Sequence, residues 1–222
     1  EKNIDNAISF LQVQDGILDS AGKILDRMAE LKALSQDVLK NASDIANYNS
    51  EFQNLQVQLH QMSQTTFNGV SLAGAGTTAI FGGSNTQDVT VSIFTSATGE
   101  SGSKVSINKT MLLSALTIDA SDLTSASFTN AGKNNAAAAG TGGIFSFAAD
   151  SVAGTMTLDK VSVAVFTQAL QNIATLRAEN GGSVSRLQFS KESAAAQRTN
   201  LEAANGRIMD VDIASESTRL AK

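Results

Sequence analysis

Apolar side chains recur along the first part of the chain at alternating steps of four and three positions. The members of this seam are Ile17, Ala21, Ile24, Met28, Leu31, Ser35, Val38, Ala42 and Ile45. Such spacing places them on one stripe of a helix with a seven-residue repeat. The pattern predicts one helix of about 45 residues, roughly 70 Å long. Ala7 and Phe10 extend the stripe backwards, and a second stripe of Leu11, Leu18 and Leu25 widens it.

A polar stretch, Asn47-Tyr48-Asn49-Ser50, interrupts this pattern. After it the apolar steps resume at three, four and three positions, through Phe52, Leu55, Leu59 and Met62. We therefore predict a shorter second helix that folds back on the first. It should end near Asn68-Gly69, a pair that is typical of turns.

A second helical arm is predicted from about residue 158 to residue 222. Its first stripe comprises Leu158, Val161, Val165, Ala169, Ile173 and Leu176, and its second half repeats every seven residues at Leu187, Ala194, Leu201 and Ile208. Glycine costs a helix about 1 kcal/mol per residue, so Gly181-Gly182 is a candidate break. We predict that the helix continues through this pair.

Between the arms, residues 69–157 hold most of the glycines and few of the charged residues. Val89, Val91 and Ile93 alternate with Thr90 and Ser92, a pattern that predicts a strand. The preceding "TAIF" is the predicted partner, across the turn "GGSNTQD". Further strand candidates are "KVSIN", "LTID", "IFSFA" and "TMTLD", and the low-complexity "NNAAAAGTGG" is predicted to be a loop.

The predicted fold class is mainly α with a β-rich insertion. Long antiparallel helices from both chain ends form an elongated rod, with a returning helix, a β-hairpin and a small β-rich central domain. Residues 1–95 are predicted to hold the N-terminal rod helices and hairpin, and residues 96–157 a variable β-rich insertion. Residues 158–222 should pack with residues 1–95 as one domain. The predicted core seam is Ile17, Ile24, Met28, Leu31, Val38, Ile45, Leu187, Leu201 and Ile208.

Composition excludes several functions. The chain of 222 residues has no cysteine, which rules out disulfides, thiolate metal sites and thiol nucleophiles. Its single histidine, His60, removes histidine clusters, and the chain has neither a Gly-x-Ser-x-Gly elbow nor a His-Glu-x-x-His helix. The net charge of −5 argues against nucleic acid as a partner, and no apolar run is long enough to span a membrane. Proline, which breaks helices, is absent. We therefore predict no catalytic residue, no cofactor and no membrane partner.

One acidic motif, "GRIMDVDIASES" at residues 206–217, admits two interpretations. Asp210 and Asp212 could hold a divalent cation, or they could be polar side chains on a solvated helix. Positions two apart on a helix point in directions about 200° apart, so these carboxylates do not share a face. A cation would also need further ligands that converge on one point. We predict no metal site.

Five stretches together resemble bacterial flagellin, the subunit of the flagellar filament. "DGILDSAGKILDRMAEL" (15–31) resembles a family stretch that ends in Leu-x-Arg-x-x-Glu-Leu, and "TTFNG" (65–69) a Phe-Asn-Gly turn. "AIFGG…VTVSI" is similar to the family's hairpin, and "LR…GG…RL", from Arg177 to Arg186, to the start of its C-terminal rod helix. "NGRIMDVDIASES" is similar to an Arg-Ile-x-Asp-x-Asp signature. The likeness covers about residues 1–95 and 158–222.

The resemblance implies a structural protein that polymerises through rod–rod contacts for motility. The implied partners are other flagellin subunits, an export chaperone and hook-associated proteins, and the implied location is the extracellular flagellum. The chain is expected to lack the terminal segments of the filament core. Candidate residues for contact with neighbouring subunits are Arg207, Asp210 and Asp212.

The same resemblance makes Toll-like receptor 5 of animals a candidate partner. Arg27, Glu30 and Leu31 match part of the surface that this receptor recognises. The family pattern has glutamine where this chain has Asp26 and Leu34, which argues against strong activation. A plain ion pair between Arg27 and Glu30, three residues apart on a helix, is the simpler interpretation.

Two other functions share the helical layout. One is a hook–filament junction protein, and the motifs at 15–31 and 206–217 favour flagellin over it. The other is an extracellular adhesin or binding module that uses the insertion as its head. The few aromatic residues, 5% of the chain, argue against a dedicated ligand pocket in the insertion.

Overall fold

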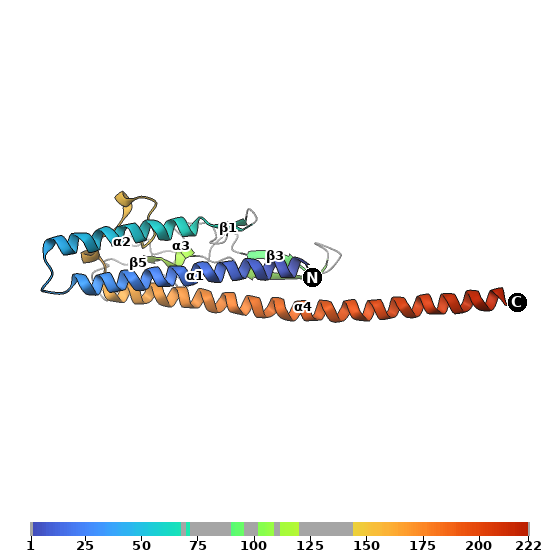
Figure 1. Ribbon diagram of the computed structural model, residues 1–222. Helices are drawn as coiled ribbons and strands as arrows, with labels where there is room; N and C mark the ends of the chain where they lie inside the picture. Colours follow the sequence, from blue (N-terminus) through green and yellow to red (C-terminus); the bar gives the residue numbers. More distant parts are fainter. Residues whose placement is uncertain are drawn as a thin grey trace.

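Three long helices form an elongated rod in the computed structural model, which describes residues 2–67, 70–71, 90–95, 102–108, 112–119 and 144–221 (Figure 1). Helix α1 spans Lys2–Ser35, α2 spans Ala42–Ser63 and α4 spans Val163–Leu220. α1 and α4 lie side by side and antiparallel, and α2 returns along the other side of α1 (Figure 1). α4 continues well beyond the amino-terminal end of α1 (Figure 1). The predicted fold class, a helical rod with antiparallel β-structure between its arms, is confirmed.

The turn between α1 and α2 lies earlier than predicted. α1 ends at Ser35 and α2 begins at Ala42, so a single helix through Ile45 and a break at residues 47–50 are both wrong. Asn41 caps α2 by accepting a hydrogen bond from the Asp44 amide at 2.9 Å, and the Asp44 carboxylate accepts one from the Asn41 amide at 3.4 Å. This reciprocal capping starts a new helix there. The seven-residue spacing of apolar residues continues across the turn, although residues 36–41 are not helical.

The buried stripe of α1 keeps Ala21, Met28 and Leu31 of the predicted seam but has Leu18 and Leu25 in place of the neighbouring Ile17 and Ile24. Its members are Ile4, Ala7, Leu11, Leu18, Ala21, Leu25, Met28 and Leu31. Ile17, Ile24 and Ile45 are only half-buried, at the edges of the core. Leu11, Leu18 and Leu25, predicted only to widen the seam, are fully buried members of it.

Three members of the predicted core seam are wrong. Val38 is 94% exposed because it lies in the α1–α2 turn. Leu201 and Ile208 are exposed because α4 extends past the helix that would cover them. Met28, Leu31 and Leu187 lie fully buried.

The apolar core is divided into two clusters along the rod. The turn-side core consists of Leu18, Ala21, Leu25, Met28, Leu31, Phe52, Leu59, Leu112, Ala115, Leu116, Phe147, Leu158, Val161, Val165, Phe166, Ala169, Ile173 and Leu176. The hairpin-side core consists of Ile4, Ala7, Phe10, Leu11, Ile107 and Leu187. α1 and α4 contribute to both clusters, so these two helices hold the rod together.

Short strands fill the space between the arms. The pairs are β1 (Thr66–Phe67) with β2 (Val70–Ser71), β3 (Thr90–Phe94) with β4 (Lys104–Asn108), and β5 (Thr117–Asp119) with β6 (Ile144–Ser146), all antiparallel. In the β3–β4 hairpin Ser92 is opposite Ser106. β4 is therefore a partner of β3, whereas the expected partner, residues 78–81, and the predicted loop "NNAAAAGTGG" lie outside the described residues.

The candidate strand "TMTLD" is wrong, because side chains of α2 take its backbone hydrogen bonds. Gln56 donates to the Met156 carbonyl and accepts from the Met156 amide, both at 2.9 Å. Asn49 accepts from the Leu158 amide at 2.8 Å. The chain here passes through two 3₁₀ turns, η2 (Val152–Gly154) and η3 (Leu158–Lys160), before α4 begins at Val163 rather than near residue 158. A short helix, α3 (Leu112–Ala115), precedes β5.

The prediction that α4 continues through Gly181-Gly182 is confirmed, since one unbroken helix spans both residues. In the described part of the chain no helix has the length and apolar character needed to cross a membrane.

Candidate functional site

No helix that the structure describes covers residues 195–220 of α4, which we call the exposed half of α4. Every described residue in this segment is exposed, and the segment extends past the amino-terminal end of α1 (Figure 1). The large apolar side chains that it carries in solvent are Leu201, Ile208, Met209, Val211, Ile213 and Leu220. Isolated exposed apolar residues are ordinary, but a continuous series of them marks an interaction surface.

Four of the α4 side chains form a continuous heptad row, Leu187, Ala194, Leu201 and Ile208. Leu187 is fully buried in the hairpin-side core, and Ala194 is half-buried against the same cluster. Leu201 and Ile208, seven and fourteen residues further on, are 70% and 63% exposed. The row that packs on α1 therefore continues without cover once α1 has ended.

The three polar residues predicted for subunit contacts, Arg207, Asp210 and Asp212, lie on this exposed half. All are exposed, and Asp210 and Asp212 occupy helical positions two apart, so their carboxylates diverge. Among the residues that the structure describes, no group of three or more His, Cys, Asp or Glu side chains is placed to hold a metal ion. Asp212, four positions beyond Ile208, lies beside the heptad row, whereas Asp210, two positions beyond Ile208, faces away from it.

The structure separates the three residues expected to face a receptor. The Arg27 guanidinium holds the Glu51 carboxylate through two hydrogen bonds, of 2.7 and 3.1 Å, and also pairs with Glu30 at 3.0 Å. Leu31 is fully buried in the turn-side core, as its place in the predicted core seam requires, so it does not share a surface with Arg27 and Glu30. The sequence gives no local signal for Glu51, because nothing near it shows that the middle of α2 lies beside the last third of α1.

The Arg27–Glu51 pair links α1 to α2 and is sensitive to pH. Its hydrogen bonds hold the pKa of Glu51 below the ordinary value of 4.5. This stabilisation is complete above pH 4.5 and is lost as the pH falls through the lower folded-state value.

We expect Glu51→Gln to lower the melting temperature slightly at pH 7, because both partners are largely exposed. The difference from the wild type should shrink as the pH falls below 4.5. Thermal unfolding at a series of pH values measures this. Glu202→Gln, which removes a pair with Arg198 one turn away on the exposed half, is the matched control. A difference that stays constant down to the lowest pH would contradict the assignment.

Three further ion pairs, not found from the sequence, align α1 with α4 at two places. Arg177 pairs with Asp15 at 3.1 Å and with Asp19 at 3.4 Å. Lys191 pairs with Asp5 at 2.7 Å. The side chains in these ion pairs are partly exposed. The pairs therefore contribute more to the register of the two helices than to the free energy of unfolding.

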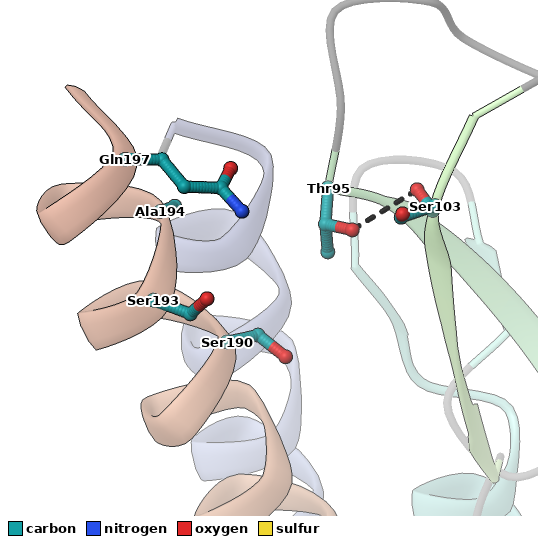
Figure 2. Close-up of a pocket in the computed structure, with 6 residues that line it drawn as sticks. All are labelled: Thr95, Ser103, Ser190, Ser193, Ala194 and Gln197. Carbon is teal, nitrogen blue, oxygen red and sulfur yellow. Dashed lines mark hydrogen bonds between the residues drawn. The ribbon is translucent and has the colours of Figure 1, made fainter. Parts of the chain in front are cut away.

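A small polar groove of about 160 Å³ lies between α4 and the loop end of the β3–β4 hairpin, at Thr95 and Ser103 (Figure 2). Its lining residues are Thr95, Ser103, Ser190, Ser193, Ala194 and Gln197. The Thr95 hydroxyl donates to the Ser103 carbonyl at 3.0 Å (Figure 2). The lining side chains that the structure describes supply neither a charge nor a general base that could activate a nucleophile. His60 is half-buried on α2 and does not line this groove.

A helical rod whose core row continues into solvent is typical of a structural subunit that buries this surface by assembly. The chain matches sequence models of the bacterial flagellin N-terminal helical region over residues 1–77 and of the C-terminal helical region over residues 163–222. It is similar to "Flagellin FlaB2" of Treponema pallidum (strain Nichols), with 27% identity over 99% of this chain and 68% of the relative. The crystal structure of Bacillus cereus flagellin has a similar fold, with a TM-score of 0.55 and 22% identity, covering 91% of this chain and 94% of that one.

The chain therefore belongs to the bacterial flagellin family. It is a structural subunit of the flagellar filament and not an enzyme, and it polymerises with other flagellin subunits into the extracellular filament. Nothing in these comparisons favours a junction protein or an adhesin.

Proposed function

We propose that the exposed half of α4 is the surface through which this subunit packs against neighbouring flagellin subunits. The observation that carries the proposal is the heptad row, which is buried at Leu187 and exposed at Leu201 and Ile208. Fully burying a leucine or isoleucine side chain contributes about 1.5–3 kcal/mol. Covering the two exposed members by a neighbouring rod helix would therefore favour assembly substantially.

The charged side chains close in sequence to Ile208 supply orientation. Arg207, Asp210 and Asp212 carry both signs of charge within six residues, around Ile208. Charges at the rim of an interface contribute little affinity, but they disfavour incorrect registers. We propose that these three residues pair with charged side chains of the neighbouring subunit and set the register of packing.

Secretion, an export chaperone and hook-associated proteins belong to the same proposal. A chain that exposes the heptad row before assembly needs that row covered or kept apart from other copies, and binding by a chaperone would do this. Recognition by Toll-like receptor 5 would rest on Arg27 and Glu30 without Leu31, because Leu31 is buried. Arg27 is already engaged by Glu51, so a receptor would compete with that pair.

The test is to replace both exposed members of the row, Leu201→Asp and Ile208→Asp, in the flagellin of the native bacterium. We expect the double variant to reach the culture medium as unassembled subunits, with filaments lost by electron microscopy and motility lost. Its thermal stability as free protein should match the wild type, because both side chains are already in solvent.

The matched control is Ala203→Asp with Ala214→Asp, which adds the same charge on the other side of the same helix, about 200° from Leu201 and about 240° from Ile208. Filaments in the control but not in the row variant support the proposal. Normal filaments from the row variant, or equal loss in both variants, would show that the row is not the packing surface. Failure to reach the medium would assign the row to export.

A further inference from the structure

A polar layer separates the two cores of the rod. Gln14 of α1 and Asn180 and Ser183 of α4 are all buried, and they lie between the turn-side core, which ends at Leu18 and Leu176, and the hairpin-side core, which begins at Leu11 and Leu187. We call these three residues the polar joint. Ile17, which is half-buried, packs against both clusters. Among the residues that the structure describes, the half-buried Ile17 and Val184 are the apolar side chains at this level, and the fully buried apolar packing between α1 and α4 is interrupted here.

Asn180 is not fully satisfied in this layer. Its side-chain nitrogen donates to the Leu11 carbonyl of α1 at 2.8 Å. Its side-chain oxygen is buried and has no hydrogen-bond partner. A buried acceptor without a partner destabilises the closed packing, and the site would gain if a local opening admitted water.

Two glycines follow Asn180 directly within α4. A Cβ built on Gly181 or Gly182 would meet no atom within 4 Å, whereas one on Gly22 would lie 3.9 Å from Ile173. No steric demand of this chain therefore requires glycine at 181 or 182. What the pair does change is the stiffness of the helix, because glycine in a helix interior has the greatest backbone freedom.

The polar layer, the unpartnered Asn180 oxygen and the two glycines lie at one level of the rod. We infer from them that the rod has a bend point at the polar joint. α4 opens locally at residues 180–184, and the turn-side and hairpin-side cores move relative to each other as two rigid halves. The heptad row belongs to the hairpin-side half, so a bend at the joint reorients the proposed packing surface without breaking either core. The bend point concerns the free subunit, so it stands or falls independently of the assembly test.

The absence of cysteine from the natural sequence permits a direct measurement with spin labels. Labels at Ala174→Cys and Ala195→Cys, both exposed, flank the joint at a separation of about 30 Å along the helix. We expect a broad distance distribution in the otherwise wild-type chain and a clearly narrower one after Gly181→Ala with Gly182→Ala. The matched control places labels at Ala195→Cys and Ala214→Cys, around Gly206, which also has nothing within 4 Å of a Cβ. That distribution should not respond to the changes at 181 and 182.

Amide hydrogen exchange gives an independent readout. Protection factors at residues 181–186 should be about tenfold or more below those at residues 170–176, and the two alanines together should raise them by roughly tenfold. Asn180→Leu should raise them as well, because it replaces the polar layer with an apolar contact. Three outcomes would each overturn the inference: a narrow distribution in the wild type, protection equal to that of the flanking turns, or loss of protection throughout the rod in Asn180→Leu. The last would make Asn180 a register lock.

Discussion

Leu31→Asp is expected to unfold the turn-side half of the rod. Leu31 is fully buried near the end of α1, in the cluster that joins α1, α2 and α4. A carboxylate at this position would have to be buried without a partner, which costs several kcal/mol, or be protonated, or expel the helix end. Because whole domains are stable by only about 5–15 kcal/mol, this one change should remove most of the cooperative transition. Circular dichroism during thermal unfolding measures the loss.

The matched control for this change is Val38→Asp. Val38 belongs to the same apolar seam in the sequence, seven residues after Leu31. Its side chain, however, lies in solvent in the α1–α2 turn. The free energy of unfolding of this variant should lie within about 0.5 kcal/mol of the wild-type value, as for an ordinary surface substitution. Equal destabilisation by both changes would mean that the helix continues through residue 38. No destabilisation by either would mean that Leu31 is not in the core.

The contrast between Leu31 and Val38 shows where sequence reasoning succeeds and where it stops. Spacing alone identifies a long amphipathic arm, but it treats both residues alike, because a seven-residue period carries no information on where the helix ends. The end is set by Asn41 and Asp44, whose reciprocal hydrogen bonds start α2. A capping box of this kind is visible in the sequence, and giving it weight over the continuing period would have placed the turn correctly.

The register of the core was harder to obtain from the sequence. Both the seam through Ile17 and the stripe through Leu18 are apolar, and only the partner helix decides which one faces inwards. Long-range contacts have no local signal at all. Gln56 and Asn49 take the backbone hydrogen bonds of residues 156–158, so a segment with strand-like alternation forms 3₁₀ turns instead.

The candidate interface on α4 was also only partly predictable from the sequence. The heptad row of α4 can be read from the sequence as one continuous stripe, but its division into buried and exposed members depends on where α1 ends beside it. The family motifs located Arg207, Asp210 and Asp212 on the same segment. They do not show that a core row becomes exposed there, and this is the feature that suggests an assembly surface.

Phe166→Ala should be the most destabilising truncation near the start of α4. The ring of Phe166 is 1% exposed, packs edge-on against Phe52 with centroids 5.9 Å apart, and lies 5.1 Å from Phe147. It therefore joins α4 both to α2 and to the segment that follows β6. Deleting a buried phenylalanine side chain costs about 3–5 kcal/mol, the transfer of the ring plus the cavity that it leaves. Urea unfolding followed by circular dichroism should show a lower midpoint with an unchanged slope.

Phe189→Ala makes the same chemical change on the same helix, at a ring that is 71% exposed, and should leave the urea midpoint nearly unaltered. Phe166→Leu keeps most of the apolar volume and should recover much of the loss, since volume-conserving changes cost less than about 1.5 kcal/mol. A midpoint for Phe166→Ala that coincides with that of Phe189→Ala would show that the three rings do not hold α2 against α4. The returning helix would then be fixed mainly by Leu59 and by the Arg27–Glu51 pair.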